Sequence, residues 1–350
     1  RVALLPSAAY QLIKHGHKVL VESNAGAGIG FGDDNYAQAG AEIIKSHAEV
    51  FERADMIVKV KEPLPEEYGL LRKGQILFTY LHLAASKSLT EALQKTGATC
   101  IAYETVELPS RELPLLTPMS EVAGRMAVQE GAKYLEKLYG GRGVLLGGVP
   151  GVAPAKVVIL GGGVSGTAAA EIACGMRADV TVIDKSLPRL RELDGLFGGR
   201  LKTVFSTAAS IETAVASADL LIGAVLVPGA AAPRLVTRAM IKAMRPGAVV
   251  VDIAIDQGGC IETSRPTTHA DPTYVEEGVV HYCVTNMPGA VAQTSTLALN
   301  NATLPYVRAL ANDGFETACG KDPGLAAGLN VSQGRIVHSA VAEALGLSSR

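Results

Sequence analysis

A glycine-rich turn between two apolar runs constrains the fold of this 350-residue chain more than any other feature. The β-branched run Lys156–Leu160 is typical of a strand buried on both faces. Gly161, Gly163 and Gly166 follow it at G-x-G-x-x-G spacing. An Ala-rich helical pattern, Thr167–Met176, comes next, and a second apolar run then ends in an acidic residue. The glycines therefore stand in the strand–turn–helix–strand context that a dinucleotide-binding unit requires.

Each position of this pattern has a physical task in a nucleotide site. Gly161 makes the tight turn, Gly163 lets a pyrophosphate approach bare backbone, and Gly166 lets the helix pack closely on the strand. The amides that open the helix, at Val164 and Ser165, then face the phosphates, and the helix dipole favours the negative charge. The pattern predicts cofactor contacts at these positions.

The acid at the end of the second run, Asp184, indicates which dinucleotide is bound. Its carboxylate is placed to accept hydrogen bonds from the adenosine ribose hydroxyls. A 2′-phosphate about 4 Å away would be repelled by roughly 1–4 kcal/mol, depending on the local dielectric. Lys185 is adjacent, but no arginine stands beside it. The sequence therefore favours NAD over NADP.

Composition excludes several classes of protein. A net charge of −2 argues against nucleic-acid binding as the main activity. The apolar runs are too short to span a bilayer, so no membrane segment is expected. Five widely spaced cysteines without a C-x-x-C motif indicate a reducing compartment, the cytoplasm. No H-E-x-x-H motif, carboxylate cluster or cysteine set predicts a metal, and no G-x-S-x-G motif supports hydrolase chemistry.

Alternating strand and helix patterns predict an α/β protein of two domains. The predicted plan is a Rossmann doubly wound parallel sheet inserted in a second, Rossmann-like α/β substrate domain. The substrate domain comprises 1–116 and 293–350, and the NAD-binding domain comprises 117–292 with a linking helix, Thr117–Tyr139, at its start. Ser120 resembles the cap of that helix.

The individual elements are predicted from hydrophobic periodicity. The strands of the first domain are Lys18–Glu22, Met56–Val60, Gln75–Thr79 and Thr99–Ala102. The strands of the nucleotide domain are Lys156–Leu160, Asp179–Ile183, Thr203–Phe205, Leu220–Ala224, Ala248–Asp252 and Val279–Val284. The predicted helices outside that domain are Ser7–Lys14, Asp34–Ala39, Glu66–Leu71, Ser86–Lys95, Leu297–Asn312, Pro323–Gly328 and His338–Leu345. We expect the C-terminal helices to return to the first domain.

Polar side chains follow the predicted strands on the side where a parallel sheet binds ligands. Lys61 and His82 end two strands of the first domain, and a lysine–histidine pair there is plausible for catalysis. Alternatively, Lys61 is a solvated surface charge, and His82 is a turn residue whose hydrogen bonds are made within the protein. Asp256 lies in a Gly-flanked turn beyond another strand end, and Asn286 and Met287 follow the last strand. These three residues are predicted to edge the cleft.

Several long segments together resemble alanine dehydrogenase from Arg1 almost to the C-terminus. The similar segments read RVALLP, KVKEP, FTYLHLAA, PMSEVAGR, GVLLGGVPG, IGAVLVPG, VDIAIDQGGC and NMP. The resemblance implies NAD-dependent oxidative deamination of L-alanine to pyruvate and ammonium, and the reverse reaction. It also implies a homohexamer.

The resemblance further implies a role for individual residues. The residues matching Arg1 and Lys61 bind the substrate carboxylate and carbonyl, and Met119 lies beside the substrate. The residue matching His82 is the acid/base, and the one matching Asp256 helps to position water or ammonia. The nucleotide site is implied at positions Ser120, Asp184, Ser206, Val225, Leu226, Ile253, Arg265, Asn286 and Met287.

Two alternatives share this plan. One is the NAD-binding subunit of a proton-translocating transhydrogenase, which needs a membrane partner and a different sequence near the nicotinamide. The other is a non-catalytic NAD-binding protein, against which stand Lys61, His82 and Asp256. The sequence also departs from the family at its start, because the family has a strand before the residue that matches Arg1. We therefore expect further residues upstream.

Overall fold

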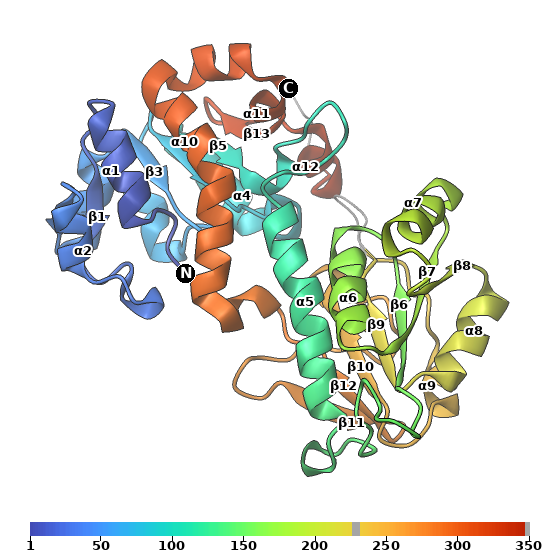
Figure 1. The fold of residues 1–350 in the computed structure, drawn as a ribbon. Coiled ribbons are helices and arrows are strands. Elements are labelled where there is room, and N and C mark those ends of the chain that lie inside the picture. Colours follow the sequence, from blue (N-terminus) through green and yellow to red (C-terminus); the bar gives the residue numbers. More distant parts are fainter. Residues whose placement is uncertain (226–231, 347–350) are drawn as a thin grey trace. The chain divides into compact units, whose positions relative to one another are not determined.

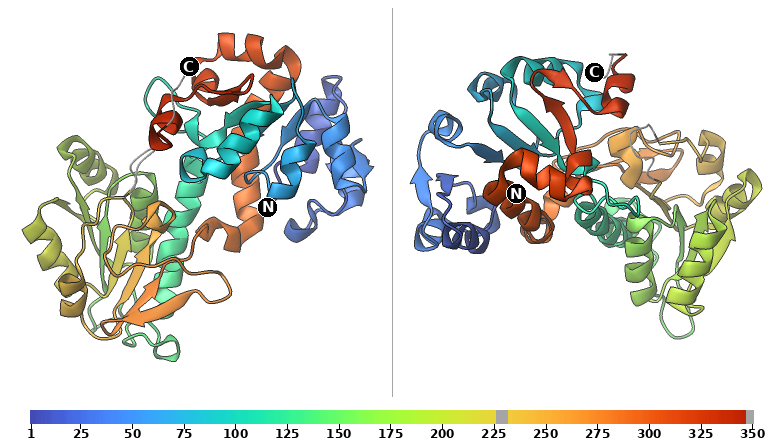
Figure 2. Two further views of the ribbon diagram at one scale, coloured as in Figure 1. Left: turned by 180° about the vertical axis from the view of Figure 1, so that it is seen from behind. Right: turned by 90° about the horizontal axis from the view of Figure 1, so that it is seen from above.

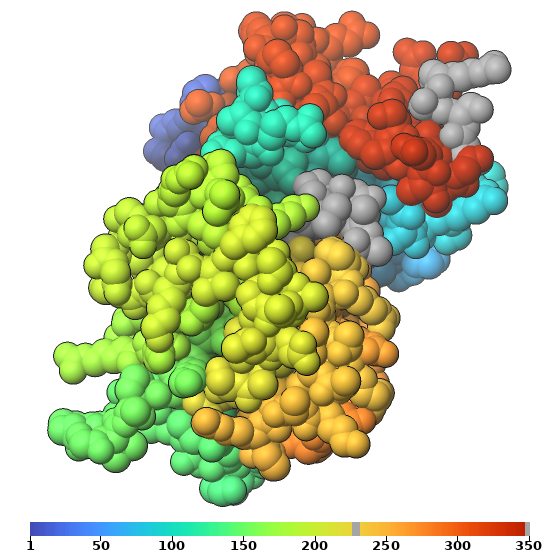
Figure 3. Space-filling model, turned by 90° about the vertical axis from the view of Figure 1, so that its right-hand side faces the viewer, coloured from blue at the N-terminus to red at the C-terminus, as the bar shows by residue number. Residues whose placement is uncertain are grey.

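The computed structural model describes residues 1–225 and 232–346 of the chain. It divides into two compact units: residues Arg1–Met119 with Val291–Arg350 form the first unit, and Ser120–Ala290 form the second (Figure 1). The predicted cofactor residue Leu226 lies outside the described residues. In the space-filling view, the surface of the first unit is built from both ends of the chain, as its blue-to-cyan and red atoms show (Figure 3).

The second unit contains a seven-stranded sheet in the order β11-β12-β10-β9-β6-β7-β8. Its strands are β6 (Lys156–Leu160), β7 (Asp179–Asp184), β8 (Lys202–Phe205), β9 (Leu220–Gly223), β10 (Val249–Asp252), β11 (Thr273–Glu276) and β12 (Val279–Tyr282). All pairs are parallel except β11 with β12. Without β11 this is the doubly wound order of two mononucleotide-binding halves, so the predicted fold class is confirmed.

Helices connect these strands and cover the sheet. They are α5 (Thr117–Tyr134), α6 (Val164–Gly175), α7 (Leu187–Phe197), α8 (Ala208–Ser217) and α9 (Arg238–Ala243), with the 3-10 helices η5 (Lys137–Tyr139), η6 (Ile253–Gln257) and η7 (Met287–Val291). The prediction that Ser120 caps α5 is wrong, because the helix begins at Thr117 and Ser120 lies inside its first turn. The Thr117 hydroxyl donates instead to the Leu113 carbonyl at 3.1 Å.

The first unit contains a five-stranded sheet in the order β14-β13-β5-β4-β3 and a separate two-stranded sheet, β1-β2. Its strands are β1 (Leu20–Glu22), β2 (Glu42–Ile44), β3 (Met56–Val58), β4 (Ile76–Thr79), β5 (Thr99–Ala102), β13 (Leu329–Ser332) and β14 (Arg335–Ile336). The pairs β3·β4 and β4·β5 are parallel, whereas β13 pairs antiparallel with β5 and with β14. Sequence periodicity predicted the three parallel strands but missed β2, β13 and β14.

The helices of the first unit come from both chain segments. They are α1 (Pro6–Lys14), α2 (Asp33–Gln38), α3 (His47–Arg53), α4 (Lys87–Thr96), α10 (Ala292–Lys321), α11 (Pro323–Ala327) and α12 (Ser339–Ala344), with the 3-10 helices η1 (Ala27–Ile29), η2 (Pro65–Leu70), η3 (Leu83–Ala85) and η4 (Tyr103–Thr105). The long helix α10 lies against α1 and η1, and Figure 2 shows it from behind and from above. Its Asn300 carboxamide accepts a hydrogen bond from the Leu5 amide at 3.0 Å.

Each unit has its own hydrophobic core. In the second unit, buried side chains of the central strands, including Val158, Leu221 and Val250, pack with helix residues such as Ile241. In the first unit, the core joins strand residues Leu77 and Cys100 to Val331 and Val341 from the C-terminal segment. No helix among the described residues is long and apolar enough to cross a membrane.

Candidate functional site

The glycines of the nucleotide turn are required by close backbone contacts. Gly161 has a φ of +96°, and a Cβ built there would lie 2.8 Å from the Ala224 carbonyl oxygen. A Cβ at Gly166 would lie 1.8 Å from the Gly161 carbonyl oxygen. A Cβ at Gly163 would meet no protein atom within 4 Å. The backbone at Gly163 therefore has open space before it, which fits the close approach of a pyrophosphate to the start of α6.

Asp184, at the end of β7, organises this turn. One carboxylate oxygen accepts a hydrogen bond from the Gly162 amide at 2.7 Å, and the other accepts from the Ser186 amide at 2.8 Å. The acid is thus tied to the glycine turn, a role that motif spacing did not reveal. Its own carbonyl accepts from the Ser206 amide at 3.0 Å, so the predicted residues Asp184 and Ser206 lie together.

Arg189 was missed by sequence reasoning. From α7 its guanidinium donates to the Gly162 carbonyl at 2.6 Å and to the Thr167 hydroxyl at 2.7 Å. It also pairs with Glu192 at 2.7 Å. Gly162 is therefore held at its amide by Asp184 and at its carbonyl by Arg189. An arginine at the start of the helix after the acid was the available signal.

Asp256 lies in η6, just beyond β10, and its side chain is exposed. Its carboxylate accepts a hydrogen bond from the Asn286 amide at 3.1 Å. Asn286 has a left-handed backbone, with φ +54°, and its carbonyl contacts His269 Nε2 at 3.2 Å. The structure thus brings the predicted residues Asp256 and Asn286 together. Met287, the residue after Asn286, is buried.

The turn that carries Asp256 is built around a buried carboxylate. Asp252 is fully buried at the end of β10 and accepts hydrogen bonds from the amides of Ala254 and Cys260, each at 3.1 Å. Burial raises the pKa of Asp252, although hydrogen bonds from Ser264, Cys260 and Ile261 oppose the shift. Asp252 is therefore a structural acid, and its neighbour Asp256 is the one presented to solvent.

The remaining predicted nucleotide residues are spread over the second unit. Arg265 is exposed, and its guanidinium lies 3.9 Å from the centre of the Tyr274 ring. Val225 and Ile253 follow β9 and β10, at the carboxyl ends of adjacent strands. Ser120 lies in α5.

In the first unit, the loop after β3 presents one lysine and anchors another. Lys59 forms an ion pair with the buried carboxylate of Glu67, which also contacts His47 Nε2 at 3.1 Å. Lys61 is exposed, and its carbonyl accepts from the Thr79 hydroxyl at 2.9 Å. Lys59 is therefore held by an ion pair with a buried carboxylate, whereas the Lys61 side chain is exposed to solvent.

His82 follows β4 in an uncommon backbone conformation. Its φ of +51° and ψ of +37° lie in the left-handed region, which costs about 1 kcal/mol or more for a residue with a Cβ. Glu104 holds this turn, because its carboxylate accepts from the amides of Leu81 at 3.1 Å and of His82 at 2.5 Å. The imidazole stacks on Tyr80 with 5.9 Å between ring centres.

A carboxylate that was not predicted lies beside the His82 imidazole. Glu62 Oε2 is 3.4 Å from His82 Nδ1, and the two side chains are 38% and 47% exposed. Burial alone would lower the pKa of His82, but the hydrogen bond to Glu62 and the charge of Glu104 outweigh it and raise that pKa. The hydrogen bond from His82 lowers the pKa of Glu62 to about 2. Glu62 is therefore ionised at neutral pH.

Arg1, which is partly buried, and the buried Met119 lie together in the first unit. The Arg1 guanidinium is 3.1 Å from the Met119 sulfur. Arg1 and Met119 are two of the three residues that the resemblance assigns to the substrate, and they are neighbours although 118 positions separate them in the chain.

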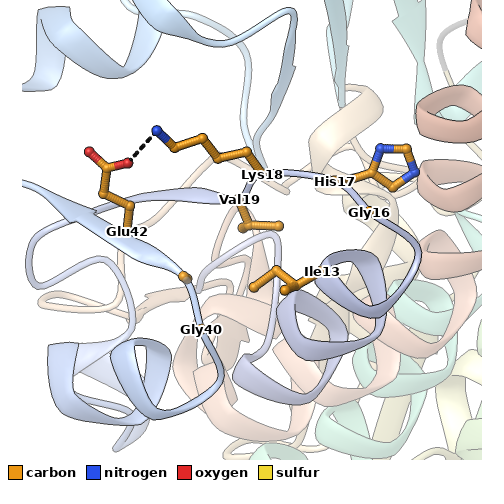
Figure 4. A pocket seen from close by; sticks show the side chains of 8 residues that line it. Ile13, Gly16, His17, Lys18, Val19, Gly40 and Glu42 are labelled. Atoms are coloured by element: carbon orange, nitrogen blue, oxygen red, sulfur yellow. Dashed lines mark ion pairs between the residues drawn. The ribbon is translucent and has the colours of Figure 1, made fainter.

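A shallow groove lies elsewhere in the first unit and contains none of these residues. It has a volume of 510 Å³ and is lined by Ile13, Gly16, His17, Lys18, Val19, Gly40, Ala41 and Glu42 (Figure 4). The ion pair between Lys18 and Glu42, at 2.7 Å, crosses one side of it (Figure 4).

Two family models match most of the chain. The N-terminal domain of alanine dehydrogenase/PNT matches residues 1–123, and the C-terminal domain of alanine dehydrogenase/PNT matches residues 127–339. An alanine dehydrogenase of Halomonas elongata is 61% identical over 99% of this chain and 94% of its own length. An alanine dehydrogenase of Mycolicibacterium smegmatis is 54% identical, with the same coverage of both chains.

Solved structures give the same comparison. An L-alanine dehydrogenase matches with a TM-score of 0.95 and 58% identity, covering 99% of this chain and 95% of its own. A transhydrogenase from Sinorhizobium meliloti matches with a TM-score of 0.83 and 26% identity, covering 96% of each chain.

Proposed function

This chain belongs to the alanine dehydrogenase/PNT family, and we propose that it catalyses the reversible, NAD-dependent oxidative deamination of L-alanine to pyruvate and ammonium. The observation that carries the proposal is 61% identity to an alanine dehydrogenase over 99% of the chain. The side chains that the reaction needs are present at the ends of the strands, and they include Lys61, His82 and Asp256.

The alternative functions have less support. Identity is 26% to the solved transhydrogenase but 58% to the solved L-alanine dehydrogenase, at similar coverage. A purely structural NAD-binding protein would have no need for an imidazole held in a left-handed turn beside a carboxylate. The dehydrogenase is therefore the function that we propose.

The proposed cofactor is NAD. Three features of the second unit fit it: the open backbone at Gly163, the start of α6, where the amides of Val164 and Ser165 lie, and the acid at Asp184. When bound, NAD supplies the acceptor for the hydride that leaves the alanine Cα. We assign further cofactor contacts to the positions Ser120, Gly161, Gly166, Ser206, Val225, Leu226, Ile253, Arg265, Asn286 and Met287.

The first unit provides the substrate groups in this proposal. Arg1 binds the carboxylate of alanine or pyruvate, because a guanidinium matches the planar carboxylate with two donors. Met119, in contact with Arg1, packs beside the substrate. Lys61 polarises the carbonyl oxygen as a compact positive charge. His82 takes a proton from the reacting amine or water in deamination and returns it in amination.

The second unit contributes Asp256. Its carboxylate positions the water that attacks the substrate carbon in deamination, or the ammonia in amination. The hydrogen bond from the Asn286 amide fixes the direction in which that carboxylate points. The proposal extends to a homohexamer in the cytoplasm, with the first unit as the substrate domain and the second as the NAD-binding domain.

The test is an assay with NADH, pyruvate and ammonium, in which loss of reduced-nicotinamide absorbance is followed for the wild type and for His82→Ala. We expect ammonium-dependent oxidation in the wild type and a loss of about 10²- to 10⁴-fold in the variant, the usual contribution of a general acid/base. Oxidation without ammonium would indicate a hydroxy-acid dehydrogenase. Tight binding of NADH without turnover would favour the non-catalytic alternative.

A further inference from the structure

We propose that Glu62 is a positioning residue for His82. Its carboxylate accepts a hydrogen bond from the Nδ1–H group of the imidazole, so that Nε2 is the ring nitrogen that exchanges a proton with the substrate. This inference rests on the proposed function, because the proton exchanged at Nε2 is that of the proposed deamination. It adds to the proposed function the tautomer of His82 and the residue that sets this tautomer.

The geometry around His82 supports this assignment. Nδ1 lies 3.4 Å from Glu62 Oε2, which is the carboxylate oxygen facing the ring. Tyr80 covers one face of the imidazole at an interplanar angle of 26°. Glu104 accepts hydrogen bonds from the backbone amides of Leu81 and His82, so it fixes the turn and acts on the imidazole through its charge, whereas Glu62 is hydrogen-bonded to the ring.

Glu62 is itself held in place from both sides of its loop. Glu67, which is buried, accepts from the Leu64 amide at 2.6 Å and forms an ion pair with Lys59. These contacts close the loop on either side of Glu62, and Pro63 follows it directly. The carboxylate therefore reaches His82 from a braced segment, so little conformational freedom is lost when the pair forms.

The chemical consequence follows from the two ring nitrogens. A neutral imidazole carries one proton, and a carboxylate acceptor at Nδ1 stabilises the tautomer in which that proton is on Nδ1. Nε2 then has a free lone pair and takes the substrate proton as a base. The resulting imidazolium has a proton on each nitrogen, and the negative charge of Glu62 stabilises it until Nε2 returns its proton.

The first measurement does not depend on turnover. His82 in protein labelled with ¹⁵N-histidine is identified by subtracting the spectrum of His82→Gln, and its nitrogen shifts are followed with pH. We expect the Nδ1–H tautomer in the wild type and a lower pKa of His82 with mixed tautomers in Glu62→Ala. Glu62→Gln, which keeps an acceptor oxygen without the charge, should keep the tautomer and lower the pKa of His82.

The second measurement is kinetic. In Glu62→Ala we expect kcat for deamination to fall about 10²-fold, the lower end of the usual contribution of the acid/base that Glu62 orients, with its acid limb shifted to lower pH. Glu62→Gln should recover part of the rate. Glu66→Gln, an exposed acid in the same segment, is the matched control and should behave as wild type. His82 shifts and pH profiles unchanged in both Glu62 variants would overturn the inference. Absence of wild-type turnover would instead count against the proposed function.

Discussion

Gly166 is the residue of the nucleotide turn with the least room for a side chain. Because its Cβ would lie 1.8 Å from the Gly161 carbonyl oxygen, an alanine must push the helix α6 away from the turn. We expect Gly166→Ala to lower the free energy of unfolding by about 3 kcal/mol, the upper part of the usual range for overpacking. Titration with NADH should show at least about tenfold weaker binding, because the amides at the start of α6 are displaced.

Gly175 supplies the control for this prediction, because it lies at the other end of α6 and a Cβ there meets nothing within 4 Å. Gly175→Ala should leave NADH binding unchanged and raise stability by about 0.5 kcal/mol, since alanine restricts the unfolded chain. Equal binding by Gly166→Ala and Gly175→Ala would show that the turn tolerates a shifted helix.

At the residue scale, motif spacing predicted a glycine turn between a strand and a helix, which the structure shows between β6 and α6, but not the side chains that hold it. The glycine positions and Asp184 follow from spacing, because backbone approach and ribose contact require those residue types. The hydrogen bonds of Asp184 to the Gly162 and Ser186 amides depend on a side-chain rotamer, which no sequence period encodes. Glu62 was not predicted either, because its partner His82 is 20 positions away and only the folded chain brings the two side chains together.

The loop between β3 and η2 is held by one buried charge. Glu67 is 2% exposed at its side chain and joins Lys59, on the β3 side, to His47 of α3. Lys59 and His47 are 21% and 40% exposed at their side chains, so water partly solvates them once the carboxylate is removed, and losing these contacts costs about 1–3 kcal/mol. We therefore expect Glu67→Ala to lower the free energy of unfolding by about that amount in urea denaturation, and to raise KM for the substrate through the displaced Lys61.

Glu66→Ala is the paired control in this segment, because Glu66 is the exposed neighbour of Glu67. Its stability should stay within about 0.5 kcal/mol of the wild type, as for most surface substitutions. A Glu67→Ala variant as stable as Glu66→Ala would mean that Lys59 and His47 are solvated without their partner.

At the element scale, hydrophobic periodicity predicted the buried parallel strands and missed short edge strands. The strands β9 and β10 are buried at every position, so their apolar runs are unmistakable. The edge strand β11 contains Thr, Tyr, Val and Glu, and none of its positions is fully buried. β14 has two residues, too few to show a period. Such strands form because a neighbouring strand offers hydrogen bonds, a tertiary effect outside the local pattern.

At the scale of the whole molecule, the first unit contains residues from both ends of the chain, and the residues of the second unit lie between them in the sequence. Hydrophobic periodicity assigned the C-terminal segment to helices alone. The structure adds β13, which pairs antiparallel with β5 on one side and with β14 on the other. Val331 of β13 and Ile336 of β14 belong to the same core as Leu77. The five-stranded sheet therefore depends on residues at both ends of the chain.

Ending the chain at Lys321 tests this dependence. The truncation removes β13 and β14 together with the buried side chains of Val331, Ile336 and Val341, each of which contributes about 1.5–3 kcal/mol by burial. A domain is stable by only about 5–15 kcal/mol, so the first unit should lose most or all of its stability. Hydrogen exchange should then become fast in β4 and β5.

The second unit provides the internal reference for that experiment. Its strands β6, β9 and β10 pair only with strands between residues 156 and 282, so the truncation removes none of their hydrogen bonds. Their amides should remain protected, and NADH should still bind. Loss of protection in both units together would mean that they unfold as one cooperative body. Protection kept in β4 and β5 would mean that residues 1–119 and 291–321 contain enough core to fold without β13. Only the expected result, fast exchange confined to the first unit, would establish the C-terminal strands as an essential part of its sheet.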